Sequence, residues 1–156
     1  MRMPTPSSLR ASAQLTSIEL SKNGMQMLTS SKDNSVRLWD VRTAKPLRCF
    51  KGHQNTSKNF VRARFGPGKG LVSSGSEDGV VYVWDAETAS VTQRLAGHTD
   101  VAYDVQWNEQ LSLLASCSHD GTVRTWCYKA TMPLVCSDDL GDPWTRSAWT
   151  GTPTPS

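Results

Sequence analysis

An internal repeat is the feature that most constrains the fold of this chain. Three segments align on one another: LTSSKDNSVRLWD at residues 28–40, VSSGSEDGVVYVWD at 72–85 and ASCSHDGTVRTWC at 115–127. The repeated acidic and aromatic positions are Asp33, Asp78 and Asp120, and Trp39, Trp84 and Trp126. Both series recur at intervals of 45 and then 42 residues. A period of this length indicates similar supersecondary units, each stacked on its neighbours.

Each unit has the local pattern of β-structure. Short β-branched and aromatic runs alternate with Gly, Asp, Asn and Ser, the residue types of strands and tight turns. No segment of useful length has helical periodicity, so the predicted fold class is all-β. The expected strands are Leu15–Leu20, Met25–Ser30, Val36–Trp39 and Leu47–Phe50, then Phe60–Phe65, Leu71–Ser76, Val80–Trp84 and Val91–Leu95, then Val101–Trp107, Leu113–Ser118, Thr122–Trp126 and a weaker Pro133–Cys136.

Gly-His and Trp-Asp pairs punctuate these units. Gly52-His53 and Gly97-His98 lie 45 residues apart, the interval of the other markers. The pattern resembles the WD40 family from about Leu15 to Val135, which implies three four-stranded antiparallel blades of a β-propeller. Propeller rings typically contain about 4 to 8 blades. We therefore expect an open arc or part of a larger ring, from a fragment, a short isoform or half of an assembly.

The repeat also predicts the domain boundaries. A flexible segment at 1–13 precedes a first blade at 14–51, a second at 52–96 and a third at 97–136. The first blade lacks a Gly-His pair, so we expect it to be the least rigid. A disordered or loosely docked tail, rich in Asp, Gly, Pro, Thr and Ser, is expected at 137–156.

Ser, His and Asp at fixed positions of a repeat can suggest a hydrolase. A motif that recurs in every unit instead indicates architecture, because catalysis needs one serine beside one base. The family resemblance implies a structural tetrad of His, Ser or Thr, Asp and Trp, joined by hydrogen bonds that satisfy buried polar groups. Its members are His53, Ser74, Asp78 and Trp84 in the second blade, His98, Ser116, Asp120 and Trp126 in the third, and Thr29, Asp33 and Trp39 in the first. No catalytic residue and no enzymatic activity are predicted.

Charge and cysteine usage limit the kinds of partner. The net charge is +3 with basic residues scattered along the chain, so nucleic acid is an unlikely partner. Lys58, Arg62 and Arg64 form either a small basic patch or a solvated strand face. The cysteines lack C-x-x-C spacing, which indicates reduced thiols in an intracellular protein, with cytoplasm and nucleus not distinguished.

The remaining motifs predict no cofactor, metal ion or membrane segment. Cys117 and His119 are close in sequence, but strand alternation does not gather four ligands around them. No Gly-rich phosphate loop, secretory signal or long apolar run occurs. The glycosylation sequon at 55–57 is interpreted as a chance match.

One motif points to a partner. The stretch Met27–Arg42, MLTSSKDNSVRLWDVR, resembles the box by which WD-repeat proteins dock on the DDB-type adaptor of cullin-RING ubiquitin ligases. Trp39, Asp40 and Arg42 match its Trp-Asp-x-Arg end, whereas Met27 replaces an aliphatic residue. The alternative is that Arg42 merely follows a strand. The sequence thus predicts a non-enzymatic scaffold that binds other proteins, with a substrate receptor of a ubiquitin ligase, docking through Asp40 and Arg42, as the alternative.

Overall fold

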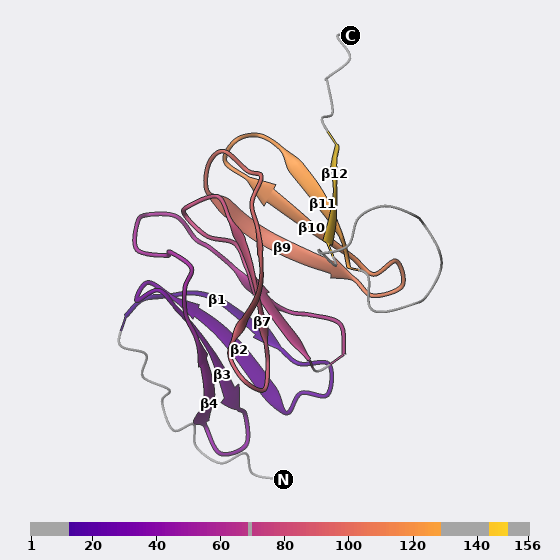
Figure 1. The fold of residues 1–156 in the computed structure, drawn as a ribbon. Helices are drawn as coiled ribbons and strands as arrows, with labels where there is room; N and C mark the ends of the chain where they lie inside the picture. The colour runs from indigo at the N-terminus through magenta and orange to yellow at the C-terminus, as the bar shows by residue number, and fades with distance from the viewer. Residues whose placement is uncertain (1–12, 69, 129–143, 150–156) are drawn as a thin grey trace, which may run out of the picture.

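The computed structural model describes residues 13–68, 70–128 and 144–149. Within these ranges the chain forms twelve β-strands and contains no helix, so none that could cross a membrane (Figure 1). The strands are β1 Leu15–Leu20, β2 Gln26–Ser31, β3 Ser35–Asp40, β4 Lys45–Phe50, β5 Ala63–Phe65, β6 Leu71–Ser74, β7 Val81–Asp85, β8 Val91–Leu95, β9 Ala102–Asn108, β10 Leu113–Ser118, β11 Val123–Tyr128 and β12 Trp144–Trp149. They make three four-stranded antiparallel sheets, which confirms the predicted fold class.

Every sheet is a simple meander in chain order. The sheets follow the orders β1-β2-β3-β4, β5-β6-β7-β8 and β9-β10-β11-β12, and each is one blade. The turn between the second and third strands has the same backbone in all three blades. Asn34, Gly79 and Gly121, each directly after the repeated Asp, have φ of 60°, 77° and 77°. This left-handed region favours Gly and Asn, which explains the residue types at the turn.

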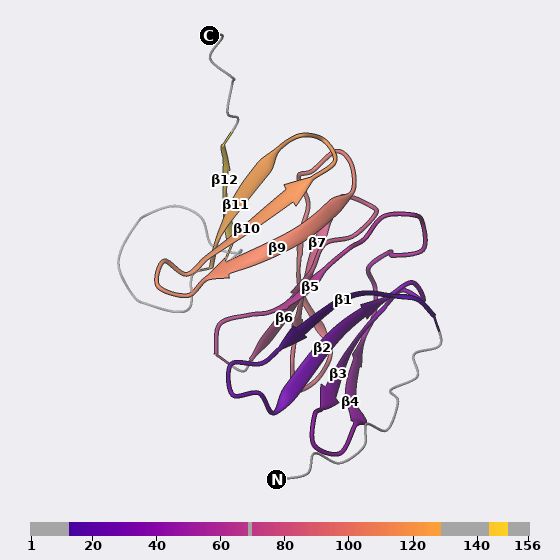
Figure 2. The ribbon, with the colours of Figure 1, turned by 180° about the vertical axis from the view of Figure 1, so that it is seen from behind.

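The blades fan out as an open arc with the β5–β8 sheet in the middle (Figures 1 and 2). Each junction between blades holds one apolar cluster. The first cluster contains Leu28, Val36, Leu38 and Phe50 of the first blade and Ala63, Val72, Tyr82 and Trp84 of the second. The second contains Val81, Val83 and Leu95 of the second blade and Ala102, Val105, Leu114 and Trp126 of the third. The core therefore lies between sheets, and burying it requires neighbouring blades to stack.

The fourth strand of the third blade differs from the prediction. β12, at Trp144–Trp149, pairs with β11 in the position expected for Pro133–Cys136, which lies outside the described residues. β12 also lies inside the segment 137–156, which was expected to be a disordered tail. The rest of that segment, 137–143 and 150–156, lies outside the described residues, and so do residues 1–12 of the expected flexible N-terminal segment. The physical reason is that WTRSAW is rich in strand-forming Trp and Thr, whereas Pro133 lacks a backbone donor.

Candidate functional site

The third blade joins its four repeated polar and aromatic side chains by hydrogen bonds. Trp126 Nε1 donates to Ser116 Oγ at 3.0 Å, and Ser116 Oγ lies 2.8 Å from His98 Nε2. His98 Nδ1 lies 3.1 Å from Asp120 Oδ2. Because the serine oxygen accepts from the indole, its proton is available to Nε2, and Nδ1–H then donates to the carboxylate. The turn carboxylate also accepts from the backbone N–H of Thr99 at 3.0 Å, which ties the turn to the start of the blade.

This series has the connectivity of a catalytic Ser-His-Asp triad, but not its accessibility. A nucleophilic serine must reach a substrate carbonyl. Ser116 is only 2% exposed, and its oxygen faces the indole of Trp126, which is 3% exposed. Burial is the main cause that lowers the pKa of His98, while Asp120 opposes it, so the imidazole is neutral near pH 7. The arrangement is suited to stabilising the blade from inside.

The second blade has the same four residue types but different hydrogen bonds. The carboxylate of Asp78 accepts from the hydroxyl of Tyr82 at 2.9 Å and from the backbone N–H of Val80 at 3.0 Å. His53 is 2% exposed, and neither of its ring nitrogens has a hydrogen-bond partner among the described residues. Burial lowers the pKa of His53 from 6.5 to about 4, against the opposing attraction of Asp78. His53 is thus a buried, neutral and unpaired imidazole.

Packing holds the remaining members of the second blade. Trp84 is fully buried; its ring stacks on Tyr82 with centroids 5.7 Å apart and meets the edge of His53 at 5.5 Å. Its Nε1 donates to the carbonyl of Lys51 at 2.9 Å, and the hydroxyl of Ser74 donates to the carbonyl of Arg62 at 3.2 Å. The four side chains are therefore neighbours without forming the hydrogen-bonded series of the third blade.

In the first blade, too, the turn aspartate bonds to the residue four positions later. Trp39 Nε1 donates to Thr29 Oγ1 at 2.9 Å, and the turn residue Asp33 forms an ion pair with Arg37 at 2.7 Å. The partner lies four residues after the aspartate, the position that Tyr82 occupies in the second blade. Sequence reasoning missed this position. This position holds Arg37, Tyr82 and Arg124 in the three blades, and because Asp120 bonds to His98 the residue type alone was not a sufficient signal.

The two residues expected to bind a partner lie at the end of β3, where Asp40 is the last strand residue, and in the turn that follows, which contains Arg42. Asp40 accepts from the backbone N–H of Thr43 at 2.7 Å and from its hydroxyl at 3.0 Å, and these bonds hold the pKa of Asp40 below its usual range. Arg42 is exposed in the same turn. The carboxylate thus fixes the turn that presents the guanidinium to solvent.

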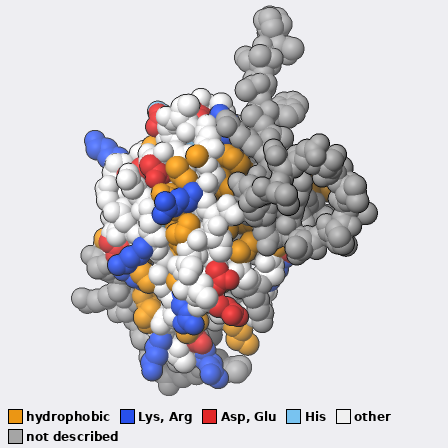
Figure 3. Space-filling model, in the orientation of Figure 1, with side chains coloured by type: hydrophobic (Ala, Val, Ile, Leu, Met, Phe, Trp, Pro, Cys, Tyr) orange, Lys and Arg blue, Asp and Glu red, His pale blue; other side chains and the backbone are white. Residues whose placement is uncertain are grey.

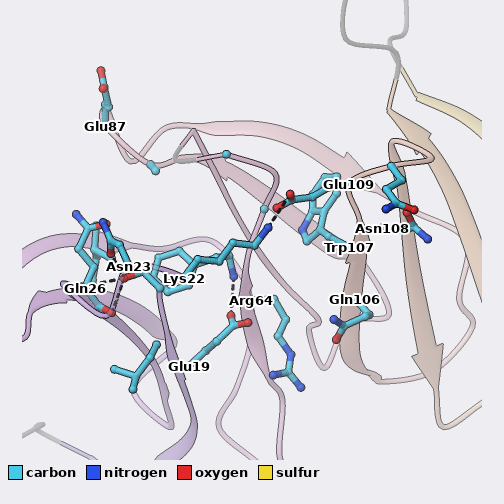
Figure 4. Close-up of a pocket in the computed structure, with 18 residues that line it drawn as sticks. Glu19, Lys22, Asn23, Gln26, Arg64, Glu87, Gln106, Trp107, Asn108 and Glu109 are labelled. Carbon is cyan, nitrogen blue, oxygen red and sulfur yellow. Dashed lines mark hydrogen bonds and ion pairs between the residues drawn. The ribbon is translucent and has the colours of Figure 1, made fainter.

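A pocket of about 800 Å³ opens where one end of each blade meets the others (Figure 4). Its lining comes from all three blades and includes Leu20, Phe65, Ala86 and Trp107 beside charged groups. Lys22 of the first blade and Glu109 of the third form an ion pair of 2.6 Å across it. No single repeat contains this site, since it exists only where three repeats are assembled.

Charged groups on the inner strands are largely paired. Glu19 accepts from the backbone N–H of Phe65 at 2.7 Å, and burial raises the pKa of Glu19. Arg64 donates two hydrogen bonds, of 3.0 and 2.8 Å, to the carboxylate of Asp104, which also pairs with Arg62 at 3.2 Å. Two of the three basic residues noted in the sequence therefore share one carboxylate, which balances part of their positive charge.

Other sequence motifs occupy structural positions. The amide of Asn55 is fully buried and donates to Thr16, Ser30 and the carbonyl of Ser31, so the sequon asparagine is engaged inside the protein. His119 Nδ1 lies 2.8 Å from the hydroxyl of Tyr103. Within the described part of the chain, no group of three or more His, Cys, Asp or Glu is placed to hold a metal ion.

Three stacked four-stranded meanders, each with the tryptophan at the same place on its third strand, define an arc of β-propeller blades. The family described as "WD domain, G-beta repeat" matches residues 6–40, 44–85 and 89–127. The chain belongs to the WD-repeat family.

Several curated proteins are similar to this chain over most of its length. A "WD repeat-containing protein 26 homolog" of Arabidopsis thaliana is 36% identical over 115 residues, which are 72% of this chain and 19% of that protein. "Autophagy-related protein 16" of Arabidopsis thaliana is 32% identical, over 74% of this chain and 23% of that protein. "Denticleless protein homolog A" of Xenopus laevis is 32% identical, over 89% of this chain and 20% of that protein. The chain thus spans about a fifth of the length of these relatives.

Proposed function

We propose that this chain is a non-enzymatic scaffold that binds other proteins through the end of the arc where its three blades meet. The observation that carries the proposal is the pocket of about 800 Å³, which combines apolar and charged lining residues from all three blades. Concave sites with an apolar lining and a few polar groups are typical binding sites. The Ser-His-Asp series of the third blade supports a structural and not a catalytic role, because buried Ser116 and His98 bond to each other and to Asp120 inside the blade.

A blocking variant tests this proposal. Gln106 is exposed and lines the pocket, so Gln106→Trp introduces a large ring at the proposed contact surface. Lys51 is equally exposed but does not line the pocket, and Lys51→Trp is the matched control. Proteins recovered from cell extract with the wild type and the control should be lost with Gln106→Trp. If no recovered protein depends on position 106, the pocket is not the binding site.

A second, narrower function is docking on the adaptor of a cullin-RING ubiquitin ligase through the Trp-Asp-x-Arg box. Its support is the exposed guanidinium of Arg42 in a turn that Asp40 fixes by two hydrogen bonds. Such a group can donate two parallel bonds to a partner carboxylate, a geometry that lysine cannot reproduce.

The Arg42→Ala variant should lose affinity for the adaptor while its thermal stability stays nearly unchanged. An exposed arginine contributes little to folding, but truncating an interface hot spot costs about 2 kcal/mol or more, roughly thirtyfold in affinity. Titration of purified chain with purified adaptor measures the affinity, and thermal unfolding measures the stability. Arg48→Ala, at another exposed arginine, is the control. Equal affinities for wild type and Arg42→Ala, or no binding by either, exclude this function and leave the scaffold proposal intact.

A further inference from the structure

Carboxylates outnumber available cations in the pocket where the three blades meet. Glu19, Glu87 and Glu109 contribute one carboxylate each from the first, second and third blades. The cations among the described lining residues are Lys22 and Arg64. The guanidinium of Arg64 already donates two hydrogen bonds to a carboxylate of the third blade, so three carboxylates of the lining remain against one ammonium group. This charge balance favours a cationic ligand.

The carboxylate of Glu19 is held in place at this site. Its Oε2 accepts from the backbone N–H of Phe65 at 2.7 Å, and no other described residue donates a hydrogen bond to it. The side chain is half-buried, and burial is the main cause that raises the pKa of Glu19. The charged carboxylate has therefore lost part of its hydration, and a cation beside it would compensate for that loss.

Lys22 shows the kind of group that the pocket accepts. From the turn between β1 and β2 its ammonium reaches Glu109, which follows β9, at 2.6 Å (Figure 4). The side chain of Lys22 is 84% exposed. An ion pair this exposed contributes little to stability, so it opens at little cost. Lys22 thus occupies the place that the cation of a partner would take.

The apolar walls of the pocket suit the aliphatic part of a long side chain. Phe65 and Trp107 occupy equivalent positions on the inner strands of the second and third blades. Both half-buried rings pack on the apolar clusters at the junctions, and Trp107 Nε1 donates to Ser73 Oγ at 2.8 Å. The rings are therefore fixed before a ligand arrives. Aromatic rings also attract ammonium and guanidinium groups.

These groups belong to the two junctions inside the arc. Glu19 bonds to the middle blade at Phe65, and Trp107 bonds to it at Ser73. The ion pair of Lys22 links the two outer blades. Blades stack through the faces of their sheets, so a further blade at either end of the arc would lie beside the pocket without filling it.

We propose that the partner is a protein segment that inserts an arginine or lysine side chain into this pocket, displaces Lys22 and pairs its cation with Glu19 and Glu109. This inference rests on the proposed function, in which the pocket binds other proteins. A side chain with an apolar stem and a terminal cation matches both the aromatic walls and the carboxylates.

Peptide titration tests the nature of the partner. The probe is the capped peptide Ala-Ala-Arg-Ala-Ala, and the same peptide with Glu or Leu at its centre is the control. In nuclear magnetic resonance spectra of the isotope-labelled chain, the arginine peptide should shift the indole N–H resonance of Trp107 and the amide resonance of Phe65 until they saturate. Neither control peptide should do so at the same concentrations.

Two variants should change the affinity in opposite directions. Glu19→Gln keeps an acceptor for the N–H of Phe65 but removes the charge, and should raise the dissociation constant of the arginine peptide about tenfold. Lys22→Ala removes the internal competitor and should lower the dissociation constant about threefold. Asp100→Asn and Lys58→Ala, at exposed positions outside the pocket lining, are the matched controls and should leave it unchanged. Circular dichroism shows that each variant is folded.

The outcomes distinguish this inference from the proposed function. Equal binding of the Leu or Glu peptide, no shift by any peptide, or no gain in Lys22→Ala would overturn the cationic partner. Proteins from extract that are lost with Gln106→Trp but still recovered with Glu19→Gln would overturn it too, and would leave the pocket as the binding site. Proteins lost with both variants support both proposals.

Discussion

The second and third blades contain the same four repeated residue types, yet they are stabilised differently. In the third blade His98, Ser116, Asp120 and Trp126 form one hydrogen-bonded series. In the second blade the turn carboxylate bonds to Tyr82, and the histidine has no hydrogen-bond partner in the part of the chain that the structure describes.

The contrast shows that the residue four positions after the turn aspartate competes with the histidine. The ring of Tyr82, at this position, stacks on Trp84 while its hydroxyl donates a hydrogen bond to Asp78. In the third blade the position holds Arg124, whose Nε and Nη1 are buried without a partner among the described residues. There the carboxylate bonds to His98. In the second blade, one residue outside the motif thus takes the turn carboxylate away from the histidine.

The largest test of this contrast replaces the buried tryptophans. Trp84→Ala should lower the free energy of unfolding by about 3 to 5 kcal/mol, because the ring is 0% exposed and packs on three aromatic neighbours. Both Phe variants lose one indole hydrogen bond, from Trp84 to the carbonyl of Lys51 and from Trp126 to the hydroxyl of Ser116. Trp84→Phe should still recover more of its loss than Trp126→Phe does relative to Trp126→Ala, since buried Ser116 also bonds to His98. Urea denaturation measures all four variants. If the two Phe variants recover equal shares of the lost stability, the second and third blades do not differ in this way.

The unpaired histidine predicts an acid-dependent loss of stability. The pKa of His53 is about 4 in the folded chain and near 6.5 when unfolded, so the unfolded chain binds more protons between these values. Its contribution is fully present above pH 6.5 and is lost as the pH falls toward 4, by about 3 kcal/mol at most. Urea denaturation across this range should show the loss.

Leucine substitutions distinguish the contributions of His53 and His98 to stability. His53→Leu should flatten the pH dependence and be nearly neutral at pH 7.5, because it removes an unpaired buried group. His98→Leu should cost stability at pH 7.5, because Ser116 and Asp120 lose a partner. His98, whose pKa is also lowered by burial, contributes a slope of the same sign that remains in His53→Leu. An unchanged slope in His53→Leu would contradict the assignment.

The smallest expected difference is between the two serines. Ser116→Ala leaves both an indole N–H and an imidazole without their buried partner and should cost about 1 to 3 kcal/mol. Ser74→Ala removes one hydrogen bond to a backbone carbonyl and should cost about 1 kcal/mol or less. Thermal unfolding of the two variants gives the comparison, and a larger loss for Ser74→Ala would reverse our interpretation.

The sequence predicted the fold well because the repeated Asp and Trp positions mark the same turn and strand in every blade. The hydrogen bonds of the repeated polar residues were not predicted, because they depend on which side chain reaches the turn carboxylate, Tyr82 in the second blade and His98 in the third. The pairing of β12 was missed because residues 129–143 separate it from β11. The pocket could not be predicted from the repeat, because residues that are far apart in the sequence, such as Lys22 and Glu109, come together only in the folded chain.

The strictly serial order of strands also has a consequence for how the chain folds. Within each sheet the strands pair in chain order, so, apart from the pair of β11 and β12, each sheet assembles from local hairpins without waiting for a distant segment. Loop-closure entropy is then small at each step, which favours rapid folding for an all-β protein. During synthesis the first blade can form its hairpins while the third is still inside the ribosome, and the apolar face that it presents to the second blade sets the order of assembly.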